Sequence, residues 1–221
     1  MPQSYEFVDI YGLDSDLLTM VSDSSRRVAA VILLFPCSNA VYKARRLEER
    51  QLQTKNNNAI KPHDRAFFIV QHSEFGNACG SIACLHAITN AEFIDKDDNR
   101  TPISRFCNEN TNSTPFERGR ALLESKELKL CSDDQAISTI AQTTCPSRNG
   151  PDLDHHFVTF SYINGRLVEL DGTKLCAIDH GPSPDDGQGF LQCAASVIQK
   201  NFMQIDPDNI EFSLMALREH S

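Results

Sequence analysis

The length, composition and charge of the 221-residue chain narrow its class. A hydrophobic content of 40% is enough for one domain with a substantial core, so we expect a single domain spanning residues 1–221. The formal net charge of −9 disfavours nonspecific binding to nucleic acid and favours a basic partner.

The sequence shows neither an export signal nor a membrane span. The opening residues, MPQSYEFVDI, lack the basic and apolar regions of a secretory signal. The longest apolar run, residues 28–35, is far shorter than the roughly 20 residues that cross a bilayer. The eight cysteines are scattered along a mid-sized chain, unlike the disulfide framework of a small secreted protein. We therefore expect reduced cysteines and a cytosolic or nuclear protein without membrane contact, and we take a cytoplasmic location as the prediction.

The first half of the chain carries two apolar runs that are typical of buried strands. VAAVILLF, residues 28–35, has the continuous apolar character of a central strand covered on both faces. RAFFIV, residues 65–70, predicts a second strand of this kind, and the helix-like SIACLHAITN follows shortly after it. Two polar stretches, residues 54–64 and 143–154, carry the weakest structural signal and are expected to form long loops.

The second half supplies clear helix and strand signals. Thr114 suits the N-cap of a helix, Pro115 suits its first position, and Glu117 completes a capping box. Apolar residues recur at helical spacing over residues 190–202 and alternate as in a strand over residues 212–216. These patterns predict an α/β architecture, in which a mainly antiparallel sheet has helices on both faces.

The dipeptide Asn164-Gly165 in HHFVTFSYINGRLVELDG is a strong signal for a two-residue hairpin turn. When the two residues that flank this turn pair with each other, Asp171 lies diagonal to His156 on one face of the sheet. His155 points to the other face, because side chains alternate along a strand. The turn chemistry alone therefore selects His156 as the partner of Asp171.

Cys79 lies in QHSEFGNACG, between the second expected strand and the helix that follows it. A helix start stabilises a thiolate, an imidazole serves as its base, and a carboxylate orients the imidazole. Cys79, His156 and Asp171 can together form the triad of a thiol hydrolase. Without Cys79, the histidine and aspartate would be better explained as a surface pair.

We expect the other cysteines to be small buried apolar residues. They are Cys37, Cys84, Cys107, Cys131, Cys145, Cys176 and Cys193. A zinc site built from Cys79, Cys84 and His86 would lack a second ligand pair at a customary spacing. We therefore expect no metal and no cofactor, and we expect His86 to be packed and hydrogen-bonded within the helix.

Six segments of the chain resemble the ubiquitin C-terminal hydrolases, the papain-like cysteine deubiquitinases of the short, single-domain C12 type. The segments cover nearly the whole chain and read EFVDIYGLDSDLLTMV, AAVILLFP, GNACGSIACLHAITN, HFVTFSYINGRLVELDG, IDHG and EFSLMAL. The resemblance implies a central six-stranded antiparallel sheet flanked by helices on both faces, with a knotted backbone. It also makes Cys79 the nucleophile, His156 the general base and then acid, and Asp171 the residue that orients the histidine.

The resemblance further implies an oxyanion hole formed by the N–H of Cys79 and a glutamine side chain upstream of it. In the family this glutamine stands six residues before the cysteine, whereas Gln71 stands eight before Cys79. If the two extra residues bulge outward, Gln71 keeps its place; if they displace it, Asn77 or another donor serves instead. Losing one such donor lowers turnover by about 10²–10³.

The reaction implied by the resemblance is hydrolysis of the bond after the C-terminal glycine of ubiquitin, through a thioester. The expected protein is a monomer with ubiquitin as its partner. Ubiquitin's tail is basic, so an acidic channel would attract it, although solvated loop charge is the better explanation for any single one of the candidate acidic residues. The candidates are Asp152, Asp154, Asp185 and Asp186.

A crossover loop corresponds roughly to residues 141–154 and looks shorter than in the short-form members of the family. It implies a preference for small or unfolded adducts and poor cleavage of folded ubiquitin chains. Two alternatives stay open on sequence alone. The first is a protein that binds and stabilises ubiquitin with negligible hydrolysis, and the second is a hydrolase for a ubiquitin-like modifier such as Nedd8.

Overall fold

A computed structural model describes residues 5–22, 26–55, 66–92, 99–129 and 154–220. Its centre is a six-stranded sheet in the order β1-β6-β2-β3-β4-β5, and every neighbouring pair is antiparallel. The strands are β1 (Tyr5–Asp9), β2 (Val28–Pro36), β3 (His155–Ile163), β4 (Arg166–Leu170), β5 (Ile178–Pro182) and β6 (Ser213–Glu219). The expected antiparallel sheet is therefore confirmed.

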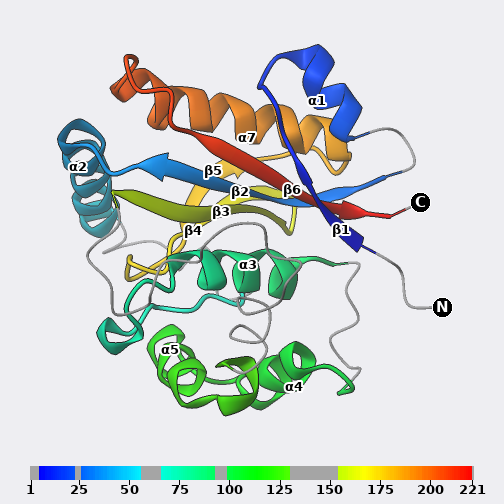
Figure 1. Ribbon diagram of the computed structural model, residues 1–221, viewed down its shortest axis with the longest axis vertical. Coiled ribbons are helices and arrows are strands. Elements are labelled where there is room, and N and C mark those ends of the chain that lie inside the picture. Colours follow the sequence, from blue (N-terminus) through cyan, green and yellow to red (C-terminus); the bar gives the residue numbers. More distant parts are fainter. Residues whose placement is uncertain (1–4, 23–25, 56–65, 93–98, 130–153, 221) are drawn as a thin grey trace, which may run out of the picture.

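Helices cover both faces of this sheet. They are α1 (Ser15–Val21), α2 (Asn39–Lys55), α3 (Cys79–Asn90), α4 (Pro102–Glu109), α5 (Pro115–Glu124) and α7 (Gly187–Asn201), with short 3₁₀ turns η2 (Ser73–Phe75) and η3 (Met203–Ile205). Figure 1 shows α1 and α7 over one face, α3 with α4 and α5 beyond it on the other, and α2 at one end of the sheet. Helices on both faces are thus confirmed.

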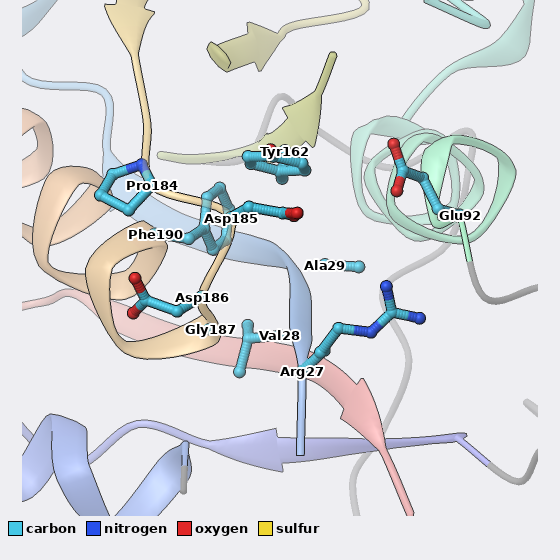
Figure 2. A pocket seen from close by; sticks show the side chains of 10 residues that line it. All are labelled: Arg27, Val28, Ala29, Glu92, Tyr162, Pro184, Asp185, Asp186, Gly187 and Phe190. Carbon is cyan, nitrogen blue, oxygen red and sulfur yellow. The ribbon is translucent and has the colours of Figure 1, made fainter. Parts of the chain in front are cut away.

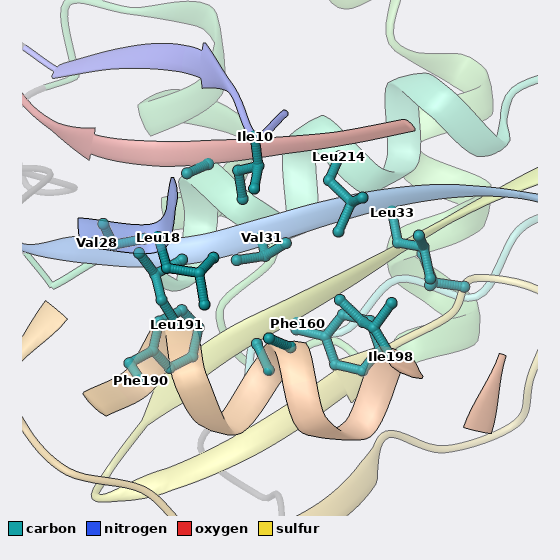
Figure 3. Packing of buried hydrophobic residues seen from close by; sticks show 14 of the residues in the cluster. Ile10, Leu18, Val28, Val31, Leu33, Phe160, Phe190, Leu191, Ile198 and Leu214 are labelled. Carbon is teal, nitrogen blue, oxygen red and sulfur yellow. The ribbon is translucent and has the colours of Figure 1, made fainter. Parts of the chain in front are cut away.

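The central strand β2 is buried on both faces, as its continuous apolar run predicts. Leu33 belongs to the core beneath α7, together with Phe160 and Ile198 (Figure 3). Ile32 points the other way, into a second core that it shares with Ala83 of α3. Successive side chains of one strand therefore hold two helical layers on the sheet.

The prediction of a strand at residues 65–70 is wrong. Residues 66–70 are buried or half-buried, but within the described ranges they pair with no strand. The side chain of Asn90 bonds both the N–H and the carbonyl of Phe67, at 2.8 and 3.1 Å, and Ile69 N–H donates to His86 Nε2 at 3.0 Å. Polar side chains of α3 thus replace a neighbouring strand as hydrogen-bond partners. An apolar run indicates burial but does not identify these partners.

Helix α5 packs directly against the same segment. Val70 N–H donates to the carbonyl of Pro115 at 3.0 Å, and the Arg118 guanidinium donates to the carbonyl of Phe68 at 3.4 Å. A Cβ atom on Gly119 would lie 1.8 Å from the carbonyl oxygen of Val70. Glycine at this position therefore permits the close approach that holds the segment leading to residue 71.

Three expected elements in the second half are confirmed. Thr114 Oγ1 accepts the N–H of Glu117 at 3.3 Å, and the Glu117 carboxylate accepts the N–H of Thr114 at 2.7 Å, which is the capping box. Helix α7 and strand β6 occupy the segments whose periodicity predicts a helix and a strand.

Several expectations concern features beyond these elements. Residues 56–64 and 143–153 of the two polar stretches lie outside the described residues, as does nearly all of the crossover loop, residues 141–153. Across the described ranges, every helix is too short or too polar to cross a membrane. The single-domain organisation and the knotted backbone stay predictions.

Candidate active site

The hairpin of β3 and β4 forms in the expected register. Asn164 and Gly165 have φ angles of 50° and 77°, the left-handed conformations that a two-residue turn of this type requires. Ile163 pairs with Arg166 across the turn, and the ladder continues without a shift to the last residue of β4. The local turn chemistry therefore sets which side chains meet at the far end of the hairpin.

His156 and Asp171 meet at that end, with His156 Nε2 lying 2.8 Å from Asp171 Oδ1. The same oxygen accepts hydrogen bonds from the N–H and hydroxyl of Thr173, at 3.0 and 2.7 Å. Burial alone would raise the pKa of Asp171, but its hydrogen bond with His156 and nearby positive charges lower this pKa below its usual range. His155 lies instead 3.4 Å from a carboxylate oxygen of Glu211. The structure thus brings His156 rather than His155 to Asp171.

Cys79 is the first residue of α3, is half-buried, and its thiol interacts with His156. Burial opposes the thiolate, but the hydrogen bond with His156 and its charge lower the pKa of Cys79 below its ordinary value. Burial likewise opposes the imidazolium, yet hydrogen bonds with Asp171 and Cys79 raise the pKa of His156 to about 9. These opposite shifts favour a thiolate–imidazolium pair held by a carboxylate.

This pairing predicts an unusual order of cysteine reactivity. Cys37 is exposed beside the site, but partial desolvation of its thiol and the negative charges of Cys79 and Asp171 raise its pKa. Since the thiolate is the reactive form, iodoacetamide near pH 7 should modify half-buried Cys79 faster than exposed Cys37. Peptide mapping by mass spectrometry would measure both rates. The His156→Ala variant should remove the advantage of Cys79, and faster modification of Cys37 in the wild type would contradict the ion pair.

The turn η2 lies between Gln71 and Cys79. Its residues Ser73 and Glu74 are exposed. The backbone N–H of Gln71 donates to the carbonyl of Gly172 at 2.7 Å, which anchors it beside the hairpin end. Its side-chain Nε2 donates to the carbonyl of Gly76 at 2.9 Å. Gln71 is therefore fixed next to the site, on the upstream side of Cys79, with its amide donor engaged within its own loop.

A cavity of about 360 Å³ lies beside the histidine and aspartate. Among its lining residues, Arg45, Arg46 and Lys174 are positively charged, in contrast to the expected acidic channel. Asp154 is exposed near this cavity, since its carbonyl accepts the N–H of Cys37 at 2.6 Å. Of the acidic candidates that the structure describes, Asp154 is therefore the one that lies near this cavity.

The expectation that Asp185 and Asp186 lie near the site is wrong. Both line a separate small hollow of about 30 Å³, together with Tyr162 (Figure 2). Tyr162 and His156 are six residues apart on β3, which separates them by about 20 Å along the strand. Asp186 also caps α7 through the N–H of Gly189 at 2.5 Å. Asp152 lies outside the described residues.

The expected burial of the remaining cysteines is only partly correct. Cys107 is buried and Cys193 is half-buried, but Cys37, Cys84 and Cys176 are exposed. Cys37 and Cys176 lie in connecting segments, and Cys84 lies on a face of α3 that does not pack on the sheet. Cys131 and Cys145 are outside the described residues.

His86 is a packed, hydrogen-bonded residue, as expected. It is fully buried, accepts the N–H of Ile69 and stacks on Phe68 with ring centroids 5.3 Å apart. Burial lowers the pKa of His86 to about 4, so its imidazole is neutral. Within the described part of the chain, no three His, Cys, Asp or Glu side chains gather as metal ligands.

The sequence-based predictions do not include a group of buried charged residues that lie next to Asp171, on the side away from His156. Arg45 of α2 donates to both carboxylate oxygens of Glu169 and lies 3.4 Å from Asp171 Oδ2. A glutamate within the apolar strand sequence LVEL indicates a buried carboxylate that needs a cation. The sequence does not indicate which of the many arginines supplies it.

Comparisons with known proteins identify the family of this chain. A family model for ubiquitin carboxyl-terminal hydrolase, family 1 (peptidase C12), matches residues 1–204. A probable ubiquitin carboxyl-terminal hydrolase of Dictyostelium discoideum is 35% identical over 97% of this chain and 79% of its own. A ubiquitin carboxyl-terminal hydrolase of Drosophila melanogaster is also 35% identical, over 97% of this chain and 87% of its own.

The fold is also similar to that of a solved structure. The Trichinella spiralis UCH37 catalytic domain bound to ubiquitin vinyl methyl ester has a TM-score of 0.68 at 17% identity, covering 99% of this chain and 87% of that chain. At this identity the similarity concerns the fold, whereas the family follows from the sequence matches. The chain therefore belongs to family 1 of the ubiquitin carboxyl-terminal hydrolases, a family of cysteine peptidases.

Proposed function

We propose that this protein is a deubiquitinase that hydrolyses the bond after the C-terminal glycine of ubiquitin. The observation that carries the proposal is the series of Cys79, His156 and Asp171: His156 Nε2 lies 2.8 Å from Asp171 Oδ1, and His156 lowers the pKa of the Cys79 thiol at the start of a helix. The relatives named as ubiquitin carboxyl-terminal hydrolases, and a similar fold solved with a ubiquitin derivative, support ubiquitin as the partner.

In the proposed reaction, the Cys79 thiolate attacks the carbonyl carbon of the terminal glycine. The resulting oxyanion accepts the backbone N–H of Cys79, and the His156 imidazolium gives its proton to the leaving amine. Collapse of this intermediate leaves ubiquitin on Cys79 as a thioester. His156, now neutral, takes a proton from water, which attacks the thioester and releases ubiquitin with a free carboxylate.

Gln71 is the proposed second donor to the oxyanion. Its backbone is anchored to the hairpin end, while its side-chain amide is engaged by Gly76, so only the side chain needs to turn. The exposure of Ser73 and Glu74 in η2 supports this role despite the altered spacing, because two extra residues can bulge outward there without displacing Gln71. Removal of the donor should lower turnover by about 10²–10³.

We infer small or unfolded adducts as substrates from the expected short crossover loop. Cleavage of a Nedd8 tail, the monomeric state and the cytoplasmic location are further expectations, and none of them follows from the triad.

The test is hydrolysis of a fluorogenic C-terminal amide of ubiquitin, measured together with ubiquitin affinity. Wild type should turn over, and Cys79→Ala should bind ubiquitin with similar affinity without turnover above background. Gln71→Ala should retain binding with a turnover reduced by about 10²–10³. If wild type binds ubiquitin and cleaves no faster than Cys79→Ala, the protein is a ubiquitin-binding protein and the hydrolase proposal fails. The same assay with a C-terminal amide of Nedd8 shows which of the two, ubiquitin or Nedd8, is hydrolysed faster.

A further inference from the structure

Arg45 occupies the side of Asp171 that faces away from His156. Asp171 Oδ1 accepts the hydrogen bonds of His156 and Thr173, whereas Oδ2 faces the guanidinium of Arg45 at 3.4 Å. The two oxygens of the carboxylate thus have different partners, with His156 on β3 on one side and Arg45 on α2 on the other. We propose that Arg45 is a positioning residue for the His156 imidazole, an inference that rests on the proposed function for the role of that imidazole.

A second series of contacts joins Arg45 to the same imidazole from another direction. The Arg45 guanidinium carbon lies 4.6 Å from the centre of the Phe202 ring. Phe202 meets Phe35 edge to face, with centroids 4.9 Å apart, and Phe35 meets His156 edge to face at 5.7 Å. Arg45 therefore reaches His156 both through a carboxylate and through two aromatic rings. These contacts form a closed loop from Arg45 to His156 and back. A shift of Arg45 would therefore move both the Asp171 carboxylate and the Phe35 ring that contact the imidazole.

Arg45 is itself held by a buried charge cluster. It donates to both oxygens of Glu169, which is completely buried, and to Glu48 at 3.1 Å. The Lys174 ammonium lies 3.5 Å from oxygens of both glutamates. Two cations and three carboxylates, those of Glu48, Glu169 and Asp171, thus share this site, in which Glu48 is half-buried and the other groups are buried.

The fork of the guanidinium explains why an arginine occupies this place. One terminal nitrogen bonds Glu169 and Glu48, and the other serves Glu169 and Asp171, so the cation sets the relative position of these acids. A lysine would supply the charge as a single point without the planar geometry. His180 also contacts this cluster, because its Nε2 lies 2.9 Å from Glu169 Oε2.

The experiment must separate positioning from the balance of buried charge, because Arg45→Met alone leaves Glu169 without its main partner. The Arg45→Met/Glu169→Gln double variant removes one positive and one negative charge, so it should be folded even where the single variant is not. Arg45→Lys retains the charge without the fork. Arg120→Met, an exposed substitution on α5, is the matched control.

If Arg45 positions the imidazole, the double variant should lose about 10- to 100-fold in kcat for the fluorogenic ubiquitin amide, with unchanged ubiquitin affinity. Arg45→Lys should recover part of this loss, and Arg120→Met should match wild type. A double variant that is folded and retains kcat within about twofold of wild type would overturn the proposal, because charge balance alone would then explain the cluster.

A second measurement does not depend on ubiquitin. Iodoacetamide modification of Cys79 across pH reports the thiolate that His156 stabilises. The modification profile of the double variant should move to higher pH, because a mispositioned imidazole stabilises the thiolate less; a profile identical to that of wild type would overturn the proposal. If wild type fails to hydrolyse the ubiquitin amide, the proposed function fails, while this profile still decides the role of Arg45.

Discussion

His156→Ala should lower kcat for the fluorogenic ubiquitin amide by about 10⁴, without loss of ubiquitin affinity. The imidazole is the group that stabilises the Cys79 thiolate, protonates the leaving amine and then activates water, and Nε2 is fixed by Asp171 at 2.8 Å. All three roles disappear together in the alanine variant. Single-turnover and steady-state rates measured beside binding affinity would separate this chemical loss from a loss of binding.

His155→Ala is the matched control, because it removes the same side chain one residue earlier on the same strand. His155 contacts Glu211 rather than Asp171, so its removal should change kcat by less than about threefold. Equal losses in the two variants would show that strand alternation does not select the catalytic histidine.

Gly119→Ala should reduce the free energy of unfolding by about 3 kcal/mol or more. The added methyl group would lie 1.8 Å from the carbonyl oxygen of Val70 and 3.1 Å from its carbon, so helix or segment must move. The adjacent Val70 N–H is bonded to Pro115 on the same helix, which leaves little freedom for either part to shift. Urea unfolding monitored by circular dichroism would measure the loss.

Arg120→Ala is the control for Gly119→Ala, because it introduces the same residue at the next position of α5. Its side chain is 69% exposed, so the substitution should change stability by less than about 0.5 kcal/mol. A Gly119→Ala variant with the unfolding midpoint of wild type would mean that the close approach is not required. The segment continues into Gln71, so a folded Gly119→Ala protein should also show reduced turnover.

Features set by local chemistry could be predicted from the sequence. The turn of Asn164 and Gly165 needs left-handed backbone at both residues, and the pairing of the strands then follows from residue counting. The capping box at Thr114 is equally local, since both hydrogen bonds lie within four residues. The placement of His156 beside Asp171 could be predicted because it depends on one such turn.

Features that depend on distant partners could not be predicted in this way. Residues 66–70 look like a strand because they are buried, but their backbone is satisfied by side chains such as Asn90 and His86. Arg45 meets Glu169 across 124 positions of sequence, and nothing in the pattern of α2 indicates this contact. The site combines one locally determined pair with supports that only the tertiary packing defines.

The position of β6 has a consequence for how the protein is made. This strand is the last described element of the chain, yet it lies between β1 and β2 in the sheet. During translation β1 leaves the ribosome first, but its neighbour in the sheet is synthesised only when residues 213–219 emerge. Until then β2 has an unpaired apolar edge, which is prone to aggregation. A premature stop before residue 213 would therefore remove an interior strand. The truncated product would have an open sheet that cellular quality control would recognise, rather than being a shortened enzyme.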